Sequence, residues 1–349
     1  MIAQVIEERL HAELEAGRLA RGAQVAVFAD GQLRAEVAVG SDHHGDPFAP
    51  DTASCLYCCS KVPLFTAVLG LIDAGSLTVD GALGSVLDDA NEFVSSCTVF
   101  ELLTQTGGVT VMPGPVSRFV PDERRRTAHT WLPESGQAPR GVPAYAVSEV
   151  GWLAALLLER VTGLTYGEAI RSISADALSE RALSVRTGSI AVTFQHDPAR
   201  EFPLPLLNEQ TTRVRSQWNP ALGWYASATA LAQYGAELEA AWHGSRKLSA
   251  DLVRYATSPQ IPVAHDVGLH RDASYGLGFW TDLSLGGFGT GLSGSAFGHA
   301  AQGGTSFVVV DPERRVVVAG CMDLAFESDT GGGERRAPLV DAILEVIDA

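Results

Sequence analysis

Basic residues are scarce in this chain of 349 residues. Its 25 lysines and arginines stand against 41 acidic residues, which gives a net charge of −16. Proteins that bind nucleic acid neutralise phosphates with clustered Lys and Arg. The one short basic cluster, residues 124–126, directly follows Asp122 and Glu123, so we interpret it as a solvated loop. We therefore expect no nucleic-acid partner.

Long apolar runs are missing as well. No stretch reaches the ~18 apolar residues that predict a membrane span. Four glutamates interrupt residues 1–18, where a secretion signal would carry an apolar segment. Neither the five cysteines nor the pair His43-His44 shows the spacing of metal ligands. We expect a cytoplasmic protein with reduced cysteines, no membrane association, no metal and no cofactor.

The pattern along the chain predicts strands near both ends and helices between them. A chain of this length is expected to form two lobes. Residues 23–39 alternate in strand fashion around a turn, and the strand pattern returns at 276–280, 305–310 and 315–320. Helical spacing marks residues 1–18, 58–74, 145–162, 227–242 and 338–347. We predict an α+β protein whose antiparallel sheet is formed by both termini, flanked by helices, with an inserted helical lobe.

The tetrapeptide Cys58-Cys59-Ser60-Lys61 opens the second predicted helix. Side chains at i and i+3 are neighbours on a helix, so the thiol of Cys58 stands beside the amine of Lys61. A thiol at a helix N-terminus next to an ammonium group is partly thiolate at neutral pH. Cys55 and Cys59 are interpreted as packing residues, and Ser60 is out of register with the lysine.

Several ordered segments resemble the serine β-lactamase and penicillin-binding-protein superfamily, with the closest similarity to class C β-lactamases, D,D-peptidases, family VIII esterases and related acyltransferases. Cys58-x-x-Lys61 resembles the Ser-x-x-Lys motif, with cysteine replacing the nucleophilic serine. The other similar segments are Lys61 to Asp80, Thr98 to Gly108, Tyr145 to Gly163, and Phe297 to Gly304 followed by Asp311-Pro312. The resemblance implies one β-lactamase-like catalytic unit over 1–349. Its sheet lobe would comprise 1–60 and 265–349, and its mainly helical lobe 61–264.

The resemblance also implies roles for four side chains. Cys58 is expected to be the nucleophile and Lys61 its proton acceptor, while the phenol of Tyr145 passes the proton to the leaving group. His299 stands where related enzymes carry Lys-Thr-Gly or His-x-Gly, and is expected to polarise Tyr145 or contact the substrate; a purely structural histidine is the alternative. The backbone N–H groups of Cys58 and Gln302 would form the oxyanion hole.

Other positions depart from the family pattern or are open. Val147 occupies the place of the motif asparagine, and Ser148 would replace its hydrogen bond only if the turn shifts by one residue. Ala301 replaces a glycine beside the cleft. Trp224 and Tyr225 follow a glycine in a loop that the family places near the site. We therefore regard Ser148, Trp224, Tyr225 and Ala301 as candidate substrate-binding residues.

Cysteine in place of serine favours transfer over hydrolysis, because the acyl-enzyme is then a thioester that amines attack readily. We expect an acyltransferase of small-molecule or natural-product biosynthesis. Its partners would be a small acyl donor, a thioester or ester that a carrier protein could hold, and an amine or alcohol acceptor. A hydrolase with the same chemistry is the first alternative, and a non-catalytic binding descendant is the second. The sequence leaves the oligomeric state open.

Overall fold

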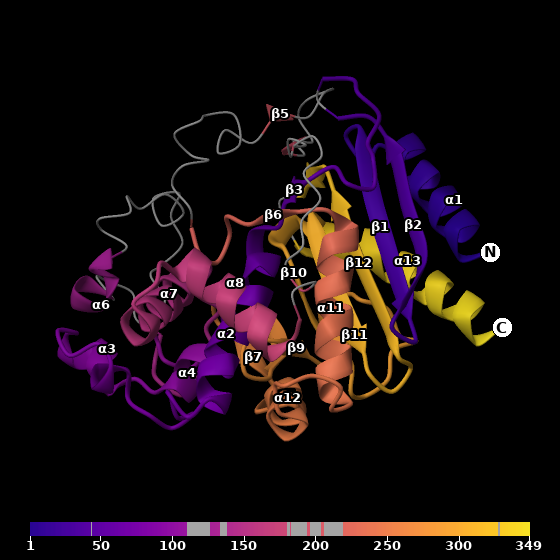
Figure 1. Cartoon of the computed structure of the whole chain (residues 1–349). Coiled ribbons are helices and arrows are strands. Elements are labelled where there is room, and N and C mark those ends of the chain that lie inside the picture. The colour runs from indigo at the N-terminus through magenta and orange to yellow at the C-terminus, as the bar shows by residue number, and fades with distance from the viewer. Residues whose placement is uncertain are drawn as a thin grey trace.

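Both ends of the chain contribute to one eight-stranded sheet (Figure 1). This computed structural model describes residues 1–42, 44–109, 126–132, 138–179, 182, 194–195, 204–205, 219–326 and 329–349. The strand order of the sheet is β2-β1-β12-β11-β10-β9-β8-β7. All neighbouring strands are antiparallel. The strands are β1 (Gly22–Ala29), β2 (Gln32–Gly40), β7 (Ile261–Asp266), β8 (Arg271–Tyr275), β9 (Trp280–Thr281), β10 (Phe297–Ala300), β11 (Ser306–Asp311) and β12 (Val316–Met322). The predicted α+β fold with a sheet built by both termini is confirmed.

The central strands are buried on both faces. Successive side chains of a strand point to opposite faces, and in β12 Val318 belongs to one hydrophobic cluster while Val317 and Ala319 belong to the other. The same division holds in β1, where Val25 and Val27 alternate with Ala26 and Phe28. The sheet therefore needs a helical layer on each face.

Helices supply both layers. On one face lie α1 (Ile2–Glu15) and α13 (Asp329–Asp348), which also contact each other. On the other face α11 (Ala228–Trp242) crosses β1, β11 and β12, and Figure 1 shows it in front of the sheet. The amphipathic first helix predicted from residues 1–18 buries Ile6 and Leu10 against the sheet.

A second group of helices packs beside the sheet, around α2 (Lys61–Asp73). Ten of the 13 residues of α2 are buried, because it runs between α7 (Glu149–Thr162) and α8 (Tyr166–Ala177). The remaining described helices are α3 (Glu92–Ser96), α4 (Val99–Leu103), α6 (Ala128–Trp131) and α12 (Ala250–Thr257). Short pairings join β3 (Ser54–Cys55) to β6 (Tyr225–Ala226). A further short sheet has β4 (Phe194–Gln195) between β13 (Leu324–Ala325) and β5 (Leu204–Pro205).

The elements differ from the sequence expectations in several places. The expected lobe boundary at residue 265 falls inside β7, and α11 packs on the sheet although we assigned it to the helical lobe. Strand structure over the predicted 276–280 begins only at Trp280, since Gly278 adopts φ +88°. The last helix starts nine residues before Pro338, which it contains.

Pro63 is the third residue of α2, where its missing N–H costs no helical hydrogen bond.

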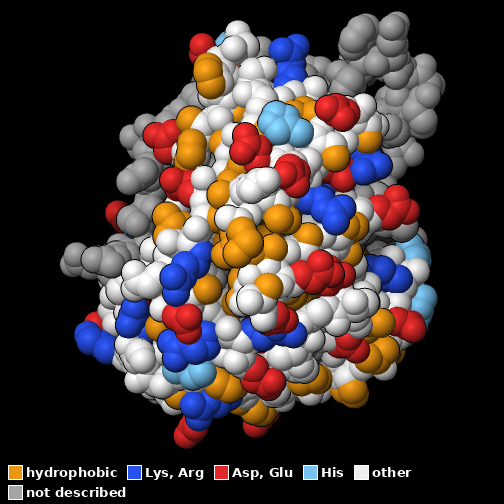
Figure 2. Space-filling view, turned by 90° about the vertical axis from the view of Figure 1, so that its right-hand side faces the viewer, with side chains coloured by type: hydrophobic (Ala, Val, Ile, Leu, Met, Phe, Trp, Pro, Cys, Tyr) orange, Lys and Arg blue, Asp and Glu red, His pale blue; other side chains and the backbone are white. Residues whose placement is uncertain are grey.

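The face that carries α1 and β2 has mixed charge. Figure 2 shows acidic and basic side chains interspersed on it, around a central group of hydrophobic side chains. Within the described ranges, each helix is too short or too polar to cross a bilayer.

Candidate active site

Cys58 lies in η1 (Tyr57–Ser60), a turn of 3₁₀ helix that runs directly into α2. Tyr57, just before it, has a left-handed backbone with φ +42°, an uncommon conformation for a residue with a side chain. Strained backbone of this kind gathers at active sites, where surrounding contacts hold it. The side chain of Cys58 is 3% exposed.

Hydrogen bonds from distant segments hold this turn in place. The N–H of Leu56 donates to Trp224 O at 2.8 Å, and the N–H of Trp224 donates to Ser60 Oγ at 3.2 Å. From β11, the Ser306 hydroxyl donates to Leu56 O at 2.6 Å. The Ser60 hydroxyl thus supports the turn that carries Cys58.

Lys61 is fully buried, and its amine points toward Cys58. Its Nζ donates to the backbone oxygen of Val147 at 2.7 Å, and Cys58 is near enough for its charge to act on this amine. Burial lowers the pKa of Lys61, because desolvation disfavours the ammonium form; the charges of Cys58 and Glu149 act in the opposite direction. A lysine with a lowered pKa can accept a proton near neutral pH.

Tyr145 joins the same cluster from the segment before α7. Its hydroxyl lies 3.5 Å from His299 Nε2, and its side chain shares a buried cluster with Cys58, whose charge acts on the phenol. The Lys61 Nζ lies 4.9 Å from the centroid of the Tyr145 ring. Burial raises the pKa of Tyr145 well above 10, and the charge of Cys58 adds a smaller contribution in the same direction, so the phenol is held as a proton donor.

His299, on β10, is held neutral. Its Nδ1 lies 3.0 Å from Ala300 O, which only accepts, so Nδ1 carries the hydrogen and Nε2 presents a lone pair to Tyr145. Burial, followed by the positive charge of Lys61, lowers the pKa of His299 to about 3. The ring stacks on Trp280 with centroids 4.9 Å apart. His299 thus contacts Tyr145 and is fixed by two other groups.

The structure brings the four expected catalytic side chains together from three separate parts of the chain. Cys58 comes from η1 and Lys61 from the adjoining start of α2, Tyr145 precedes α7, and His299 lies on β10. The other cysteine of the motif is different: Cys59 Sγ contacts His299 O at 3.5 Å, and burial raises the pKa of this thiol to about 12. Cys59 is therefore a packing residue.

The backbone after β10 turns sharply at the expected oxyanion position. Ala301 is fully buried and its N–H donates to Ser306 O at 2.8 Å, so that N–H is used by the sheet. Gln302 begins η4 (Gln302–Gly304), where the first N–H groups of a helix have no partner within it. Gly303 has φ +76°, and a Cβ there would lie 2.6 Å from Phe326 O. The closest neighbour of this glycine is therefore protein backbone.

The remaining candidate substrate-binding residues are Ser148, Trp224 and Tyr225. Ser148 follows Val147, and its fully buried hydroxyl has no hydrogen-bond partner among the residues the structure describes. The ring of Trp224 is 7% exposed and belongs to the larger hydrophobic cluster, with the Arg171 guanidinium 5.6 Å from its centroid. Tyr225 pairs with Cys55 across β6 and β3. Trp224 thus supports the Cys58 turn through its backbone, and its ring faces the helical core.

Sequence reasoning missed three contributors. Val147 supplies the carbonyl that accepts from Lys61, a role for which its side chain gives no signal. Trp280 stacks on His299 and meets Tyr145 edge-on, with ring centroids 6.1 Å apart. Its buried indole N–H has no hydrogen-bond partner in the described part of the chain. Glu149, 2% exposed, accepts the N–H of Ser148 and raises the pKa of Lys61.

The arrangement has the parts that acyl transfer requires. It offers a thiol with a lysine and a phenol beside it, and a neutral imidazole behind the phenol. A search of the described residues found no group of three or more His, Cys, Asp or Glu side chains placed to hold a metal ion.

Comparison with known proteins gives a family and a fold. The family model described as Beta-lactamase matches residues 8–337. A family VIII carboxylesterase superposes with a TM-score of 0.80 at 17% identity, over 99% of this chain and 97% of that one. A penicillin-binding-protein homologue from Caulobacter crescentus gives 0.77 at 21%, over 98% and 97%. EstCE1, a hydrolase with promiscuous acyltransferase activity, gives 0.73 at 16%, over 98% of each chain. A search of curated proteins found no match.

Proposed function

Because this chain belongs to the Beta-lactamase family, whose members are acyl-transferring or hydrolytic enzymes, we propose that it is an acyltransferase that works through a thioester on Cys58. The observation that carries the proposal is the contact of one thiol with both Lys61 and Tyr145. Two other cysteines are less suited to react, because burial raises the pKa of Cys59 to about 12 and of Cys97 to about 11. A buried thiol without such contacts is inert.

In the first half-reaction the Cys58 sulfur attacks the acyl carbon of the donor. The S–C bond forms, the bond to the donor's sulfur or oxygen breaks, and the thiol proton passes through Lys61 and Tyr145 to the leaving group. The N–H groups of Cys58 and Gln302 would stabilise the negative charge that develops on the carbonyl oxygen.

In the second half-reaction an amine or alcohol attacks the thioester. Its proton passes to Tyr145 and Lys61, the S–C bond breaks, and the sulfur leaves as the thiolate. His299 supports the phenol in both directions, since its Nε2 lone pair faces the Tyr145 hydroxyl at 3.5 Å. An acyl donor from small-molecule biosynthesis and an amine or alcohol acceptor fit this chemistry.

One feature of the structure favours transfer over hydrolysis. The thiol is 3% exposed, so bulk water has little access to the acyl carbon. The motif asparagine that contacts substrate amides in the resembling enzymes is replaced here by Val147. The buried Ser148 hydroxyl and Trp280 N–H, both without protein partners among the described residues, are then available to a polar substrate group, since buried polar groups are normally paired.

The test is the acyl-enzyme itself. The protein is incubated with short acyl thioesters and its intact mass is measured, followed by peptide mapping. We expect one acyl group on Cys58 in the wild type and in Cys59→Ala, and none in Cys58→Ala. Labelling of Cys58→Ala would overturn the assignment of the nucleophile. Absence of labelling in the wild type across a panel of thioesters and activated esters would support a non-catalytic descendant.

Added amine separates transfer from hydrolysis. If the protein is a transferase, amide formation rises with amine concentration while release of free acid falls. If free acid is released at an unchanged rate, the protein is a hydrolase of the same family.

A further inference from the structure

Three consecutive backbone N–H groups around Tyr145 are all held by other segments. The N–H of Ala144 donates to Gln105 O at 2.9 Å, and the N–H of Ala146 donates to Gln105 Oε1 at 3.0 Å. Between them, the N–H of Tyr145 donates to both carboxylate oxygens of Asp266 at 3.0 Å. Tyr145 is therefore fixed from two sides at its own backbone.

Asp266 links Tyr145 to the turn between β7 and β8. Its carboxylate is fully buried and accepts the N–H groups of Gly268 and Leu269 at 2.8 Å each, and the hydroxyl of Tyr275 at 2.6 Å. Every one of these partners donates, which suits an ionised carboxylate that only accepts. The same side chain thus fixes its own turn and the phenol-bearing segment, 121 residues away in sequence.

The turn also touches Tyr145 directly. A Cβ added at Gly268 would lie 2.7 Å from Tyr145 O and 2.8 Å from Tyr145 N, closer than carbon atoms approach backbone. Residue 268 must therefore be glycine for Tyr145 to keep its position.

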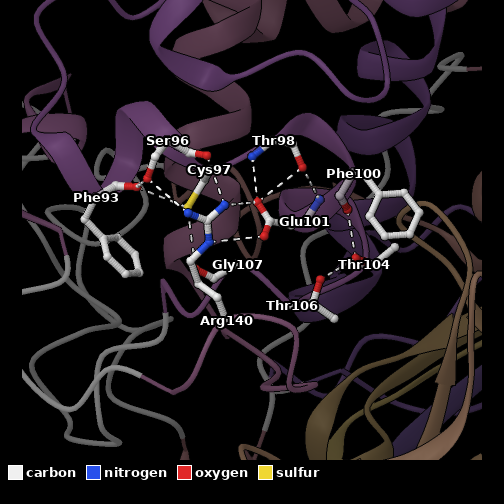
Figure 3. A network of polar contacts seen from close by, with 10 residues as sticks. All are labelled: Phe93, Ser96, Cys97, Thr98, Phe100, Glu101, Thr104, Thr106, Gly107 and Arg140. Atoms are coloured by element: carbon white, nitrogen blue, oxygen red, sulfur yellow. Dashed lines mark hydrogen bonds and ion pairs between the residues drawn. The ribbon is translucent and has the colours of Figure 1, made fainter.

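Gln105 lies in the segment that directly follows α4. It adopts φ +62°, and its side chain is 4% exposed. Figure 3 shows a polar network formed by residues next to it in the chain and by Arg140, whose guanidinium lies between the Glu101 carboxylate and Ser96. The adjacent Gly141 N–H donates to Thr106 O at 2.8 Å. The segment leading to Tyr145 is thereby attached to α4 at Glu101, to α3 at Ser96 and to the backbone after α4 at Thr106.

We propose that Asp266 and Gln105 are positioning residues for the phenol of Tyr145. They fix the backbone of residues 144–146 so that the hydroxyl reaches both Cys58 and His299. The Tyr145 to His299 contact is already long at 3.5 Å, so a small displacement of the backbone breaks it. The expected loss of acylation rate rests on the proposed function, whereas the expected change in the alkylation of the Cys58 thiol does not.

The experiment measures two properties of Cys58 in each variant. One is the rate of acyl-adduct formation, and the other is the pH profile of alkylation by iodoacetamide, read at Cys58 by peptide mass. Tyr145→Phe is the reference, because it removes the hydroxyl that contacts the thiol. We expect Asp266→Ala and Gly268→Ala to slow acylation about 10- to 100-fold, the loss that a misplacement near 1 Å produces. Their alkylation profiles should match that of Tyr145→Phe and differ from that of the wild type.

Two matched controls separate positioning from general destabilisation. Asp311 is also fully buried and accepts backbone N–H groups, from Ser293 and Arg314, in a turn that does not contact Tyr145. Gly294 has no atom within 4 Å of an added Cβ. Asp311→Ala and Gly294→Ala should keep the wild-type alkylation profile. If Asp311→Ala changes the profile as Asp266→Ala does, the effect is general loosening and the proposal fails.

A double-mutant cycle completes the test. If Asp266 acts through the phenol, Asp266→Ala in the Tyr145→Phe background slows acylation less than about 2-fold further; independent, multiplicative losses would refute the proposal. Asp266→Asn keeps one acceptor oxygen and should recover part of the rate, and Gln105→Ala should repeat the pattern of Asp266→Ala. If Asp266→Ala does not fold, Gly268→Ala and Asp266→Asn decide. Because alkylation needs no acyl donor, it still reports on positioning if the wild type forms no acyl-enzyme.

Discussion

The neutral state of His299 has a measurable effect on stability. Burial lowers the pKa of His299 from 6.5 to about 3, so the folded protein leaves the ring unprotonated where the unfolded chain protonates it. The unfolded state then binds more protons, and stability from this group is present above pH 6.5 and is lost as pH falls toward 3. Replacing His299 by glutamine should remove that dependence.

The magnitude follows from the two pKa values. Between about pH 8 and about pH 5.5, protonation of the unfolded histidine lowers the free energy of unfolding of the wild type by about 1.4 kcal/mol, a loss that His299→Gln does not show. The lower pH is chosen above the isoelectric point of about 4.9, where solubility is poorest. Asp323, whose pKa burial raises to about 6, acts with the opposite sign, but it is present in both proteins and cancels.

The assay is urea unfolding of the wild type and His299→Gln at both pH values. The variant is expected to be less stable at each pH, because Nε2 and Nδ1 both have partners. The decisive quantity is the difference between the two proteins in their change with pH. Equal changes would mean that His299 titrates normally in the folded protein, and the neutral acceptor for Tyr145 would be refuted.

Three further changes test the site. Cys58→Ser should retain weak activity shifted toward hydrolysis, because an oxygen ester is less reactive to amines; transfer at the wild-type rate would contradict the thioester argument. Lys61→Met should abolish acylation while a folded circular dichroism spectrum and cooperative melting persist, since methionine fills the buried space; an unfolded product would indicate a structural lysine. Ser148→Ala removes a buried hydroxyl without a partner among the described residues, so stability should stay equal or rise by up to about 1 kcal/mol. A rise in KM for Ser148→Ala at unchanged kcat would identify substrate binding, and a marked loss of stability would show that the hydroxyl is paired.

Local patterns in the sequence determined the elements and the chemistry that each one carries. Alternation over residues 23–39 corresponds to β1 and β2, and Gly163 ends α7 with φ +72° as the helix signal indicated. The spacing of Cys58 and Lys61 needed only the geometry of one helical turn. Such features depend on neighbours within a few residues, so one sequence is enough to predict them.

Contacts between distant segments were decided by the tertiary structure alone. Asp266 meets Tyr145 across 121 residues, Trp280 reaches His299 from the adjacent strand, and the Val147 carbonyl accepts from Lys61 across 86 residues. No local spacing encodes these pairs, because they depend on how the strands order in the sheet and on where each loop returns to it. The sequence therefore supplied the thiol, amine and phenol, and only the packed sheet and helices bring them into contact.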